Sequence, residues 1–410
     1  MDKTMQALSN EGKMLLALMR AALRGTFDRP VDWDAACSAE ALEEMILRQS
    51  LVNVVYPVIQ RQTGAPWERL KHDLKPMYER EIHKAVTQEY EIQLLLDAME
   101  RDGIDCLPMK GWVMRRFYPD PLMRSMSDFD LLIRDMDSRQ MESWMKKQGY
   151  TPEHVDQETH DVYYKPPYMN IELHRRMLDP EHLSKSESEW ADKHLQTLWN
   201  PEKCLPEKKH IYGLTNEDFY IYHISHFYKH FTGSGAGIRL LADTWLFQKE
   251  KGETLDRTYL EKQLEALHIL EFSKRMGQAA AACFDGEARL DKKDELVAAY
   301  LTSEGVYGSL ETHEALQVLG RGKGSFASNK VQIFVKRAMP PWRTMKNRYP
   351  RLRRYPWLLP FYWGIRAGRI LFLESYKVER MMQNQTREEY DALKKVYEAA
   401  GVMDNLQSDF

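Results

Sequence analysis

The chain has 410 residues, enough for two or three domains. Hydrophobic residues make up 43% of it and charged residues 29%, as in ordinary globular proteins, and the net charge of −3 gives no overall attraction to nucleic acid or membrane. The four cysteines (Cys37, Cys106, Cys204, Cys283) are far apart and form no Cys-x-x-Cys pair. This argues against zinc fingers and a disulfide scaffold, and it indicates a reducing compartment.

The sequence predicts a cytoplasmic protein with no membrane partner. Residues 1–6 lack the basic and then apolar pattern of a signal peptide. The most apolar window, residues 357–373, is interrupted by Pro360, Arg366 and Arg369, so it is a poor membrane span.

Residues 1–103 are predicted to form an N-terminal helical domain. Met14, Leu15, Leu18 and Met19 recur at helical spacing, and residues 41–47 repeat the pattern. A longer periodic stretch covers residues 67–101 and is expected to stop at Gly103.

Residues 104–184 change to short apolar runs rich in β-branched and aromatic residues. Strands are expected at 104–109, in the apolar run that ends at Ile133, and near 149–152, 160–165 and 168–174, with helices at 112–118 and 136–148. This region predicts a small mixed sheet flanked by helices, and the whole chain an α+β fold.

Residues 185–335 are predicted to form a C-terminal helical domain. Helical patterns cover residues 221–230, 238–250 and 259–283, and the glycines of residues 233–237 mark a loop.

Residues 336–410 form the last predicted region, a basic arm followed by terminal helices. Residues 336–369 hold ten lysines and arginines, no acid, and interleaved aromatic residues. Such a composition is typical of RNA-binding segments, or of a proline-rich arm that packs on the rest of the chain. We expect the arm to be ordered against the protein, because its aromatic residues are too many to leave in water.

Three carboxylates suggest a metal site. Asp128 and Asp130 are two residues apart at the start of an apolar run, so on a strand they share a face. Glu172 lies between Ile171 and Leu173 in a second predicted strand and should face away from the core. Three converging carboxylates suit Mg²⁺, and two such ions clamp both oxygens of a phosphoryl or nucleotidyl transfer.

A phosphate site is predicted upstream. Lys110 and Gly111 lie between a predicted strand and a predicted helix, where free backbone N–H groups point outward. Arg124, four residues before Asp128, is a further phosphate ligand, or it balances the charge of the carboxylates.

The order of these segments resembles the nucleotidyltransferase superfamily of DNA polymerase beta, and more closely a family of uncharacterised bacterial nucleotidyltransferases. The resemblance is carried by residues 107–111, 117–121, 124–133 and 171–175. One difference is that Lys110-Gly111 stands where the superfamily usually has glycine-serine, so the serine hydroxyl on the phosphates is missing.

The resemblance implies a metal-dependent enzyme that moves an NMP from an NTP to an acceptor hydroxyl and releases pyrophosphate. Asp128, Asp130 and Glu172 would hold two Mg²⁺ ions, while Lys110 and Gly111 would bind the phosphates. A small-molecule or protein hydroxyl is the favoured acceptor, with RNA as the alternative. Two alternative functions are a low-turnover nucleotide-binding regulator and a toxin–antitoxin component that modifies protein or tRNA.

The helix expected at residues 221–230 supplies further candidates. His226, Lys229 and His230 are predicted to line the cleft opposite the carboxylates and to contact phosphates or acceptor. His174 shares the face of Glu172 and either orients substrate or caps the strand. Arg239 and Asp243 form an i, i+4 pair that braces the cleft or lies on a helix surface.

Overall fold

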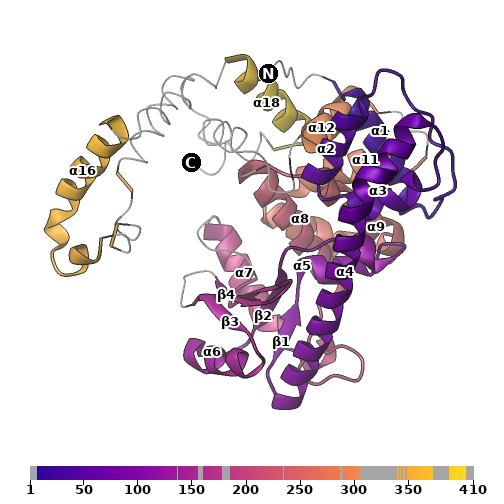
Figure 1. Ribbon diagram of the computed structural model, residues 1–410. Helices are drawn as coiled ribbons and strands as arrows, with labels where there is room; N and C mark the ends of the chain where they lie inside the picture. The colour runs from indigo at the N-terminus through magenta and orange to yellow at the C-terminus, as the bar shows by residue number, and fades with distance from the viewer. Residues whose placement is uncertain are drawn as a thin grey trace.

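The computed structural model describes residues 7–135, 137–155, 160–177, 185–233, 235–286, 290–303, 305, 339–340, 342, 345–346, 349–372 and 387–402. The fold is α+β, as predicted, with one five-stranded sheet and helices toward both ends of the chain (Figure 1).

The N-terminal helices are α1 (Asn10–Leu23), α2 (Ala39–Arg48), α3 (Val52–Ile59) and α4 (Ala65–Asp102). The hydroxyl of Ser9 caps α1 by accepting a hydrogen bond from the Gly12 N–H. Helix α4 ends at Gly103, whose φ of 71° is left-handed, so the predicted stop is confirmed. These helices form because their apolar residues recur at helical spacing and are buried on one face.

The sheet is mixed and has the order β1-β2-β5-β4-β3. Strands β2 and β5 are parallel, and the other neighbouring pairs are antiparallel. The strands are β1 (Cys106–Pro108), β2 (Phe129–Ile133), β3 (Thr151–His154), β4 (His160–Lys165) and β5 (Met169–His174).

The two faces of the sheet have different chemistry. In β5, Ile171 and Leu173 are buried while Glu172 and His174 on the other face are half-buried, which confirms the predicted alternation. The apolar face packs against the C-terminal half of α4 and against α6 (Ser138–Lys147). Figure 1 places α6 on one side of the sheet and α8 (Asn216–Gly233) on the other. The polar face of the sheet is therefore turned toward α8.

The remaining helices differ from the sequence prediction at two points. The stretch predicted as one helix over 259–283 is two helices, α10 and α11, because His268 between them has a left-handed φ of 56°. Helix α5 begins at Lys110, two residues earlier than expected. The bounds are α5 (Lys110–Arg115), α7 (Lys185–Leu198), α9 (Ile238–Lys251), α10 (Arg257–Ala266), α11 (Leu270–Phe284), α12 (Lys292–Ser303), α16 (Leu359–Phe372) and α18 (Arg387–Ala399).

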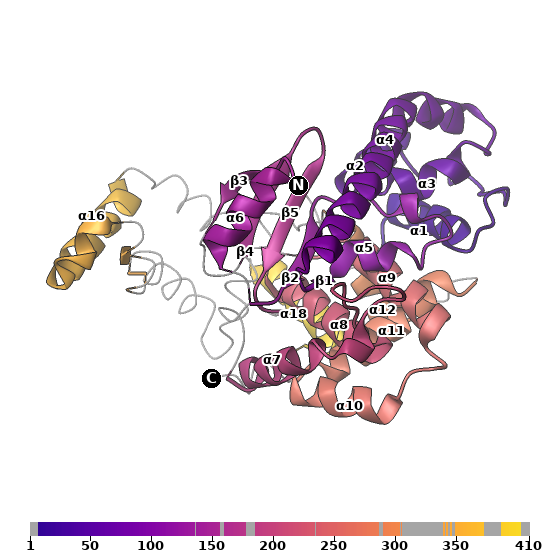
Figure 2. The same cartoon turned by 90° about the horizontal axis from the view of Figure 1, so that it is seen from below.

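The helices from the two ends of the chain share one core. A single apolar cluster contains buried residues of α1, α3, α9, α11, α12 and α18. In Figure 2, α11 and α12 lie beside α9, and in Figure 1 α18 lies beside α12. The domain boundaries at 103, 184 and 335 remain a prediction.

The basic arm differs from its prediction. Helix α16 stands apart from the sheet and the other labelled helices in both ribbon views (Figures 1 and 2). Trp357 and Phe361 are exposed, so the expected burial of the arm's aromatic residues is wrong for them. The arm packs partly on itself, since the rings of Tyr349 and Tyr362 are 4.5 Å apart. This self-packing uses one face of α16 and leaves the other in water. Several basic positions of the arm, including Lys336 and Arg337, lie outside the described residues.

Among the helices described here, none combines the length and the apolar character that crossing a bilayer requires.

Candidate active site

The parallel pairing of β2 and β5 sets two carboxylates side by side. Asp130 is directly opposite Glu172 in the register, and Leu132 is opposite His174. Asp128 lies immediately before β2, two residues from Asp130. Asp130 and Glu172 are therefore neighbours across the strand pair, and Asp128 lies just before the first residue of β2.

The side chains of Lys110 and His174 meet on one oxygen of Asp130. The Lys110 ammonium donates to Oδ1 at 2.5 Å, and His174 Nε2 lies 2.8 Å from the same atom. His174 Nε2 is also 3.5 Å from Glu172 Oε2, and His160 Nε2 is 3.8 Å from Glu172 Oε1. The carboxylates are thus joined to two histidines and a lysine in one cluster.

The titration of this cluster reflects burial and close charges. Burial alone would raise the pKa of Asp130, but Lys110 and His174 outweigh it and hold that pKa below its usual range. Burial alone would lower the pKa of Lys110, but Asp130 outweighs it and raises that pKa. Asp128 behaves differently, because burial and then the Asp130 charge raise its pKa to about 6. Asp130 is therefore the fixed anion of the group.

Gly111 is required by a close approach rather than by its backbone angles. A Cβ at this position would lie 2.7 Å from Arg124 Nη1 and 3.0 Å from Met126 Cγ. Arg124 can lie over the start of α5 only because residue 111 has no side chain.

Arg124 is buried in an ion pair that sequence reasoning did not find. Its Nε and Nη2 donate to the carboxylate of Asp243 on α9 at 3.0 and 2.8 Å. Tyr118 Oη donates to Asp243 Oδ1 at 2.7 Å. Arg239, the i, i+4 neighbour of Asp243, donates to the carbonyl and the hydroxyl of Ser125 at 3.2 Å. The Arg124–Asp243 and Arg239–Ser125 contacts both join the segment before β2 to α9. Arg239 and Asp243 thus connect two parts of the site, which is one of the two roles that the sequence suggested for them.

One face of α8 closes the site from the other side. His226 Nε2 and His230 Nε2 lie 3.0 Å apart. Burial and the Lys110 charge both lower the pKa of each imidazole. Together they bring the pKa of His230 to about 4. Burial raises the pKa of Tyr222 on the same helix, and Asp130 raises it too. Lys229 is exposed, so the structure brings His226 to the cluster more closely than Lys229.

The donor set fits a divalent cation. One ligand atom from each of Asp130, Glu172 and His174 lies within 4.8 Å of the others. Two carboxylates suit Mg²⁺ or Mn²⁺, and an imidazole nitrogen is a further donor for Mn²⁺. The buried carboxylate of Asp130, with Glu172 and His174 beside it, provides the negative charge and the donor atoms that a bound cation requires.

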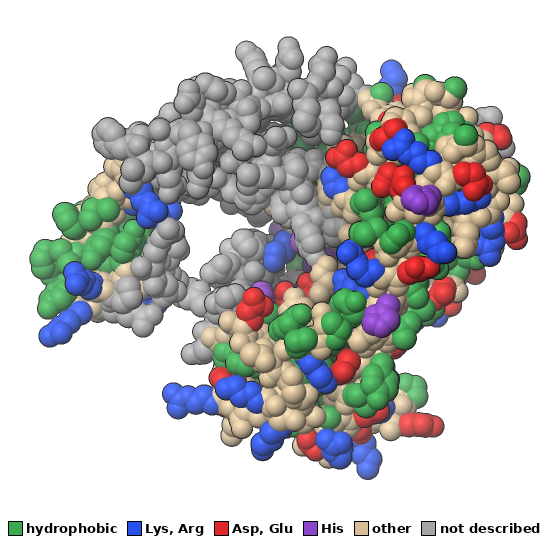
Figure 3. All heavy atoms as spheres, in the orientation of Figure 1, with side chains coloured by type: hydrophobic (Ala, Val, Ile, Leu, Met, Phe, Trp, Pro, Cys, Tyr) green, Lys and Arg blue, Asp and Glu red, His purple; other side chains and the backbone are tan. Residues whose placement is uncertain are grey.

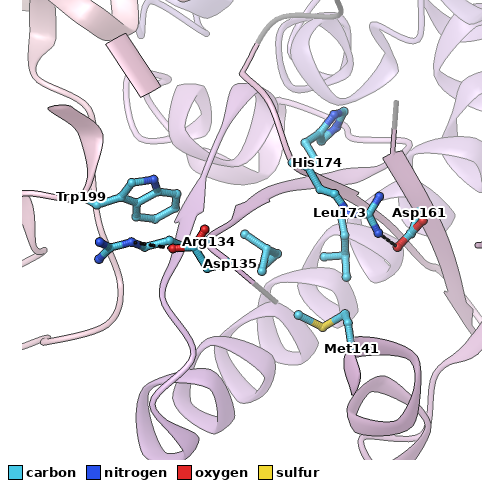
Figure 4. A pocket seen from close by; sticks show the side chains of 9 residues that line it. Arg134, Asp135, Met141, Asp161, Leu173, His174 and Trp199 are labelled. Carbon is cyan, nitrogen blue, oxygen red and sulfur yellow. Dashed lines mark hydrogen bonds and ion pairs between the residues drawn. The ribbon is translucent and has the colours of Figure 1, made fainter. Parts of the chain in front are cut away.

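A pocket of about 210 Å³ lies at the ends of β2 and β5, on the face of the sheet that α6 covers, and His174 is the one residue of the cluster that lines it. Figure 4 shows Arg134 and Asp135 joined at one side and Leu173 and Asp161 at the other, with the His174 ring pointing away from Leu173. The guanidinium of Arg175 pairs with the buried Asp161 at 2.5 Å. The pocket therefore lies on the opposite face of the sheet from Asp130 and Glu172.

Sequence reasoning missed His160 and Tyr222. His160 enters through the antiparallel register of β4 and β5, which sets it opposite His174. Tyr222 is four residues before His226 on α8, and this helical spacing could have identified it.

A mixed sheet whose parallel strands hold opposed carboxylates, beside a lysine-glycine turn, is the arrangement that the resemblance to nucleotidyltransferases implies. The chain belongs to the uncharacterised nucleotidyltransferase family, whose model matches residues 36–285. It is thus a transferase of phosphorus-containing groups. No curated protein and no solved structure matches the chain.

Proposed function

We propose that the protein transfers an NMP from an NTP to an acceptor hydroxyl and releases pyrophosphate, in a metal-dependent reaction. The observation that supports this most is the pairing of Asp130 with Glu172 across β2 and β5, with Asp128 two residues away. The family supports nucleotidyl transfer in general. The metal and the acceptor hydroxyl are our proposal.

Asp130 and Glu172 would hold Mg²⁺ with His174, since their donor atoms converge. Asp128, two residues from Asp130, would complete the ligands of two ions. Bound magnesium would neutralise the triphosphate and align the attacking and leaving oxygens. The chain's own contribution is to keep Asp130 ionised at neutral pH, because Lys110 and His174 lower its pKa.

Lys110 and the backbone of Gly111 would neutralise the leaving phosphates. Lys110 is suited to this role because its pKa is raised by Asp130, so it carries a full charge at pH 7. Arg124 was predicted as a phosphate ligand, but two of its nitrogens are engaged with Asp243. We therefore assign Arg124 to positioning of the segment that carries Asp128.

His226 would contact the nucleotide or the acceptor from α8, with Lys229 at the outer edge. Because burial lowers its pKa well below 6.5, His226 is neutral at pH 7 and can accept a hydrogen bond from a hydroxyl. A small-molecule or protein hydroxyl remains the favoured acceptor, and RNA the alternative.

Calorimetry with a non-hydrolysable NTP and Mg²⁺ tests the site. Metal-dependent binding is expected in the wild type and should be lost in the Asp128→Ala, Asp130→Ala double variant. A variant with Asp28→Ala and Asp34→Ala carries the same charge change in an exposed loop and should bind as the wild type does. Equal binding by the site variant would refute the assignment.

The acceptor can be sought in a cell extract incubated with labelled ATP, CTP, GTP or UTP. Mass spectrometry should find a product carrying one added NMP with the wild type and none with the double variant. A product that forms equally with both proteins would exclude this site as its source.

A further inference from the structure

The arm that ends in α16 is not used by the proposed function, and it has two unlike faces. Its inner face is occupied by contacts within the arm. Leu352 is buried, Trp363 Nε1 donates to the carbonyl of Pro340 at 3.0 Å, and Tyr349 packs against Tyr362. The arm is thus a structured unit and not a set of unrelated exposed residues.

The outer face is apolar and exposed. Phe361 and Ile365 are four residues apart and share one face of α16. Trp357, four residues before Phe361, lies in the 3-10 turn η5 (Pro356–Leu358) that leads into the helix. We call these three residues the stripe. The exposed fractions of Trp357, Phe361 and Ile365 are 74%, 63% and 47%. Figure 3 shows hydrophobic side chains gathered on this part of the molecule, with basic side chains at its margins. Large apolar side chains grouped in water indicate a surface that binds something.

The charges around the stripe have one sign. The sequence from 336 to 369 holds no acid. Arg351 and Arg354 are exposed at the turns before α16, and Arg369 is exposed in its last turn. An apolar stripe with cations at both ends complements a surface with an apolar interior and anionic head groups.

Three features favour a lipid surface over RNA. Ile365 is aliphatic and offers no planar face for a base to stack on. Pro360, Arg366 and Arg369 interrupt the apolar window, which prevents a transmembrane helix but suits a helix that lies in the membrane interface. Tryptophan, the most exposed member of the stripe, is a side chain typical of that interface.

We propose that the stripe formed by Trp357 of η5 and by Phe361 and Ile365 of α16 binds the surface of bilayers that contain anionic phospholipid, inserting these side chains among the head groups. The sequence-based expectation of no membrane partner rested on the net charge, the N-terminal segment and the lack of a window that could span the bilayer, and it did not consider a helix lying on the surface. This proposal is independent of the proposed function, because the stripe and the carboxylates lie on different elements.

Flotation of the full chain with lipid vesicles tests the proposal. Vesicles of phosphatidylcholine with phosphatidylglycerol should carry the protein upward, and vesicles of phosphatidylcholine alone should carry much less. The Trp357→Ala, Phe361→Ala, Ile365→Ala variant should lose at least about tenfold in partitioning. Arg351→Gln with Arg354→Gln should weaken it by about an order of magnitude and reduce its salt dependence.

Helix α4 offers a matched control. Val86, Tyr90 and Leu94 are also exposed at intervals of four residues, but Glu89 and Glu91 lie next to them. Their triple replacement by Ala removes a similar apolar stripe without touching α16, and it should leave partitioning unchanged. Far-UV circular dichroism of each variant checks that the fold is kept.

If the stripe binds RNA or a second copy of the chain instead of lipid, the binding experiments give different results. Failure of the wild type to float with anionic vesicles overturns the proposal, as does equal partitioning of the wild type and the α16 variant. Binding of bulk tRNA that the α16 variant loses, without vesicle binding, would assign the stripe to RNA. A dimer in light scattering that this variant dissociates, again without vesicle binding, would assign it to a second copy of the chain.

Discussion

The guanidinium of Arg124 and the carboxylate of Asp243 form a bidentate ion pair, with Nη2 2.8 Å from Oδ2, although 119 positions separate them in the sequence. Arg124 lies four residues before Asp128, and Asp243 lies on α9. The pair therefore fixes the carboxylate segment to the C-terminal helices. Because both side chains are buried, the ion pair connects the two segments inside the protein.

Arg124→Ala should destabilise the protein by about 3–5 kcal/mol, because it leaves the Asp243 carboxylate buried without its main partner. Urea unfolding measures this. Arg239→Ala, which removes two hydrogen bonds to Ser125, is the control and should cost about 1–3 kcal/mol. Equal unfolding midpoints for Arg124→Ala and the wild type would contradict this role of the ion pair.

Gly111→Ala should cost about 1–3 kcal/mol, because the added Cβ meets Arg124 Nη1 at 2.7 Å and forces it to move. Gly364→Ala is the matched control, since nothing lies within 4 Å of its new Cβ, and it should stabilise α16 slightly. Thermal unfolding compares the two variants. A neutral Gly111→Ala would show that the approach of Arg124 is not tight.

Lys110→Ala should weaken the binding of an NTP more than that of an NMP. Lys110 is proposed to contact the leaving phosphates, and one charge-assisted hydrogen bond contributes about 1.5–3 kcal/mol. Calorimetry with both ligands measures the difference, with Lys146→Ala on α6 as the control. If the two ligands lose affinity equally, Lys110 acts on the α-phosphate or only on Asp130.

His223→Gln should reduce the acid sensitivity of folding. Burial lowers the pKa of His223 from 6.5 to about 4, so the unfolded chain takes up a proton in that window and the folded chain does not. Stability is then lost as the pH falls from 6.5 to 4, by about 3 kcal/mol from this group. Glutamine does not titrate, and it keeps a polar group near Thr244 Oγ1, which lies 2.8 Å from His223 Nε2.

Urea unfolding across this pH range checks the expectation. The variant should lose less stability than the wild type on acidification, while His72→Gln, at a highly exposed position, should behave as the wild type does. Parallel pH curves for His223→Gln and the wild type would show that His223 is not the titrating group.

The sequence predicted the structure correctly where the pattern lies within a single strand or helix. The alternation around Glu172 predicted which side of β5 is polar, and Gly103 predicted the end of α4. Both follow from spacing along one segment. Alternation also predicted that Asp130 and Glu172 each face away from the core, whereas their direct opposition depends on the parallel register of β2 and β5.

The relationships that sequence did not predict join distant segments. The sequence offers Asp243 a partner four residues away, Arg239. The ion pair of Asp243 with Arg124 follows only from the packing of α9 against the core. His160 reaches Glu172 through strand register. The exposure of Trp357 was not predicted, because aromatic content does not tell which face of a helix finds a partner.

The length of α4 decides what can be cut from this protein. Its 38 residues run from the N-terminal bundle, where Trp67 and Leu70 are buried, to the sheet, where Ile92 and Leu95 cover the apolar face. A fragment beginning at residue 104 would lose that cover and expose the sheet to aggregation. The smallest soluble catalytic fragment should therefore retain α4 and the helices it packs on, and the family match indeed begins at residue 36, ahead of α2.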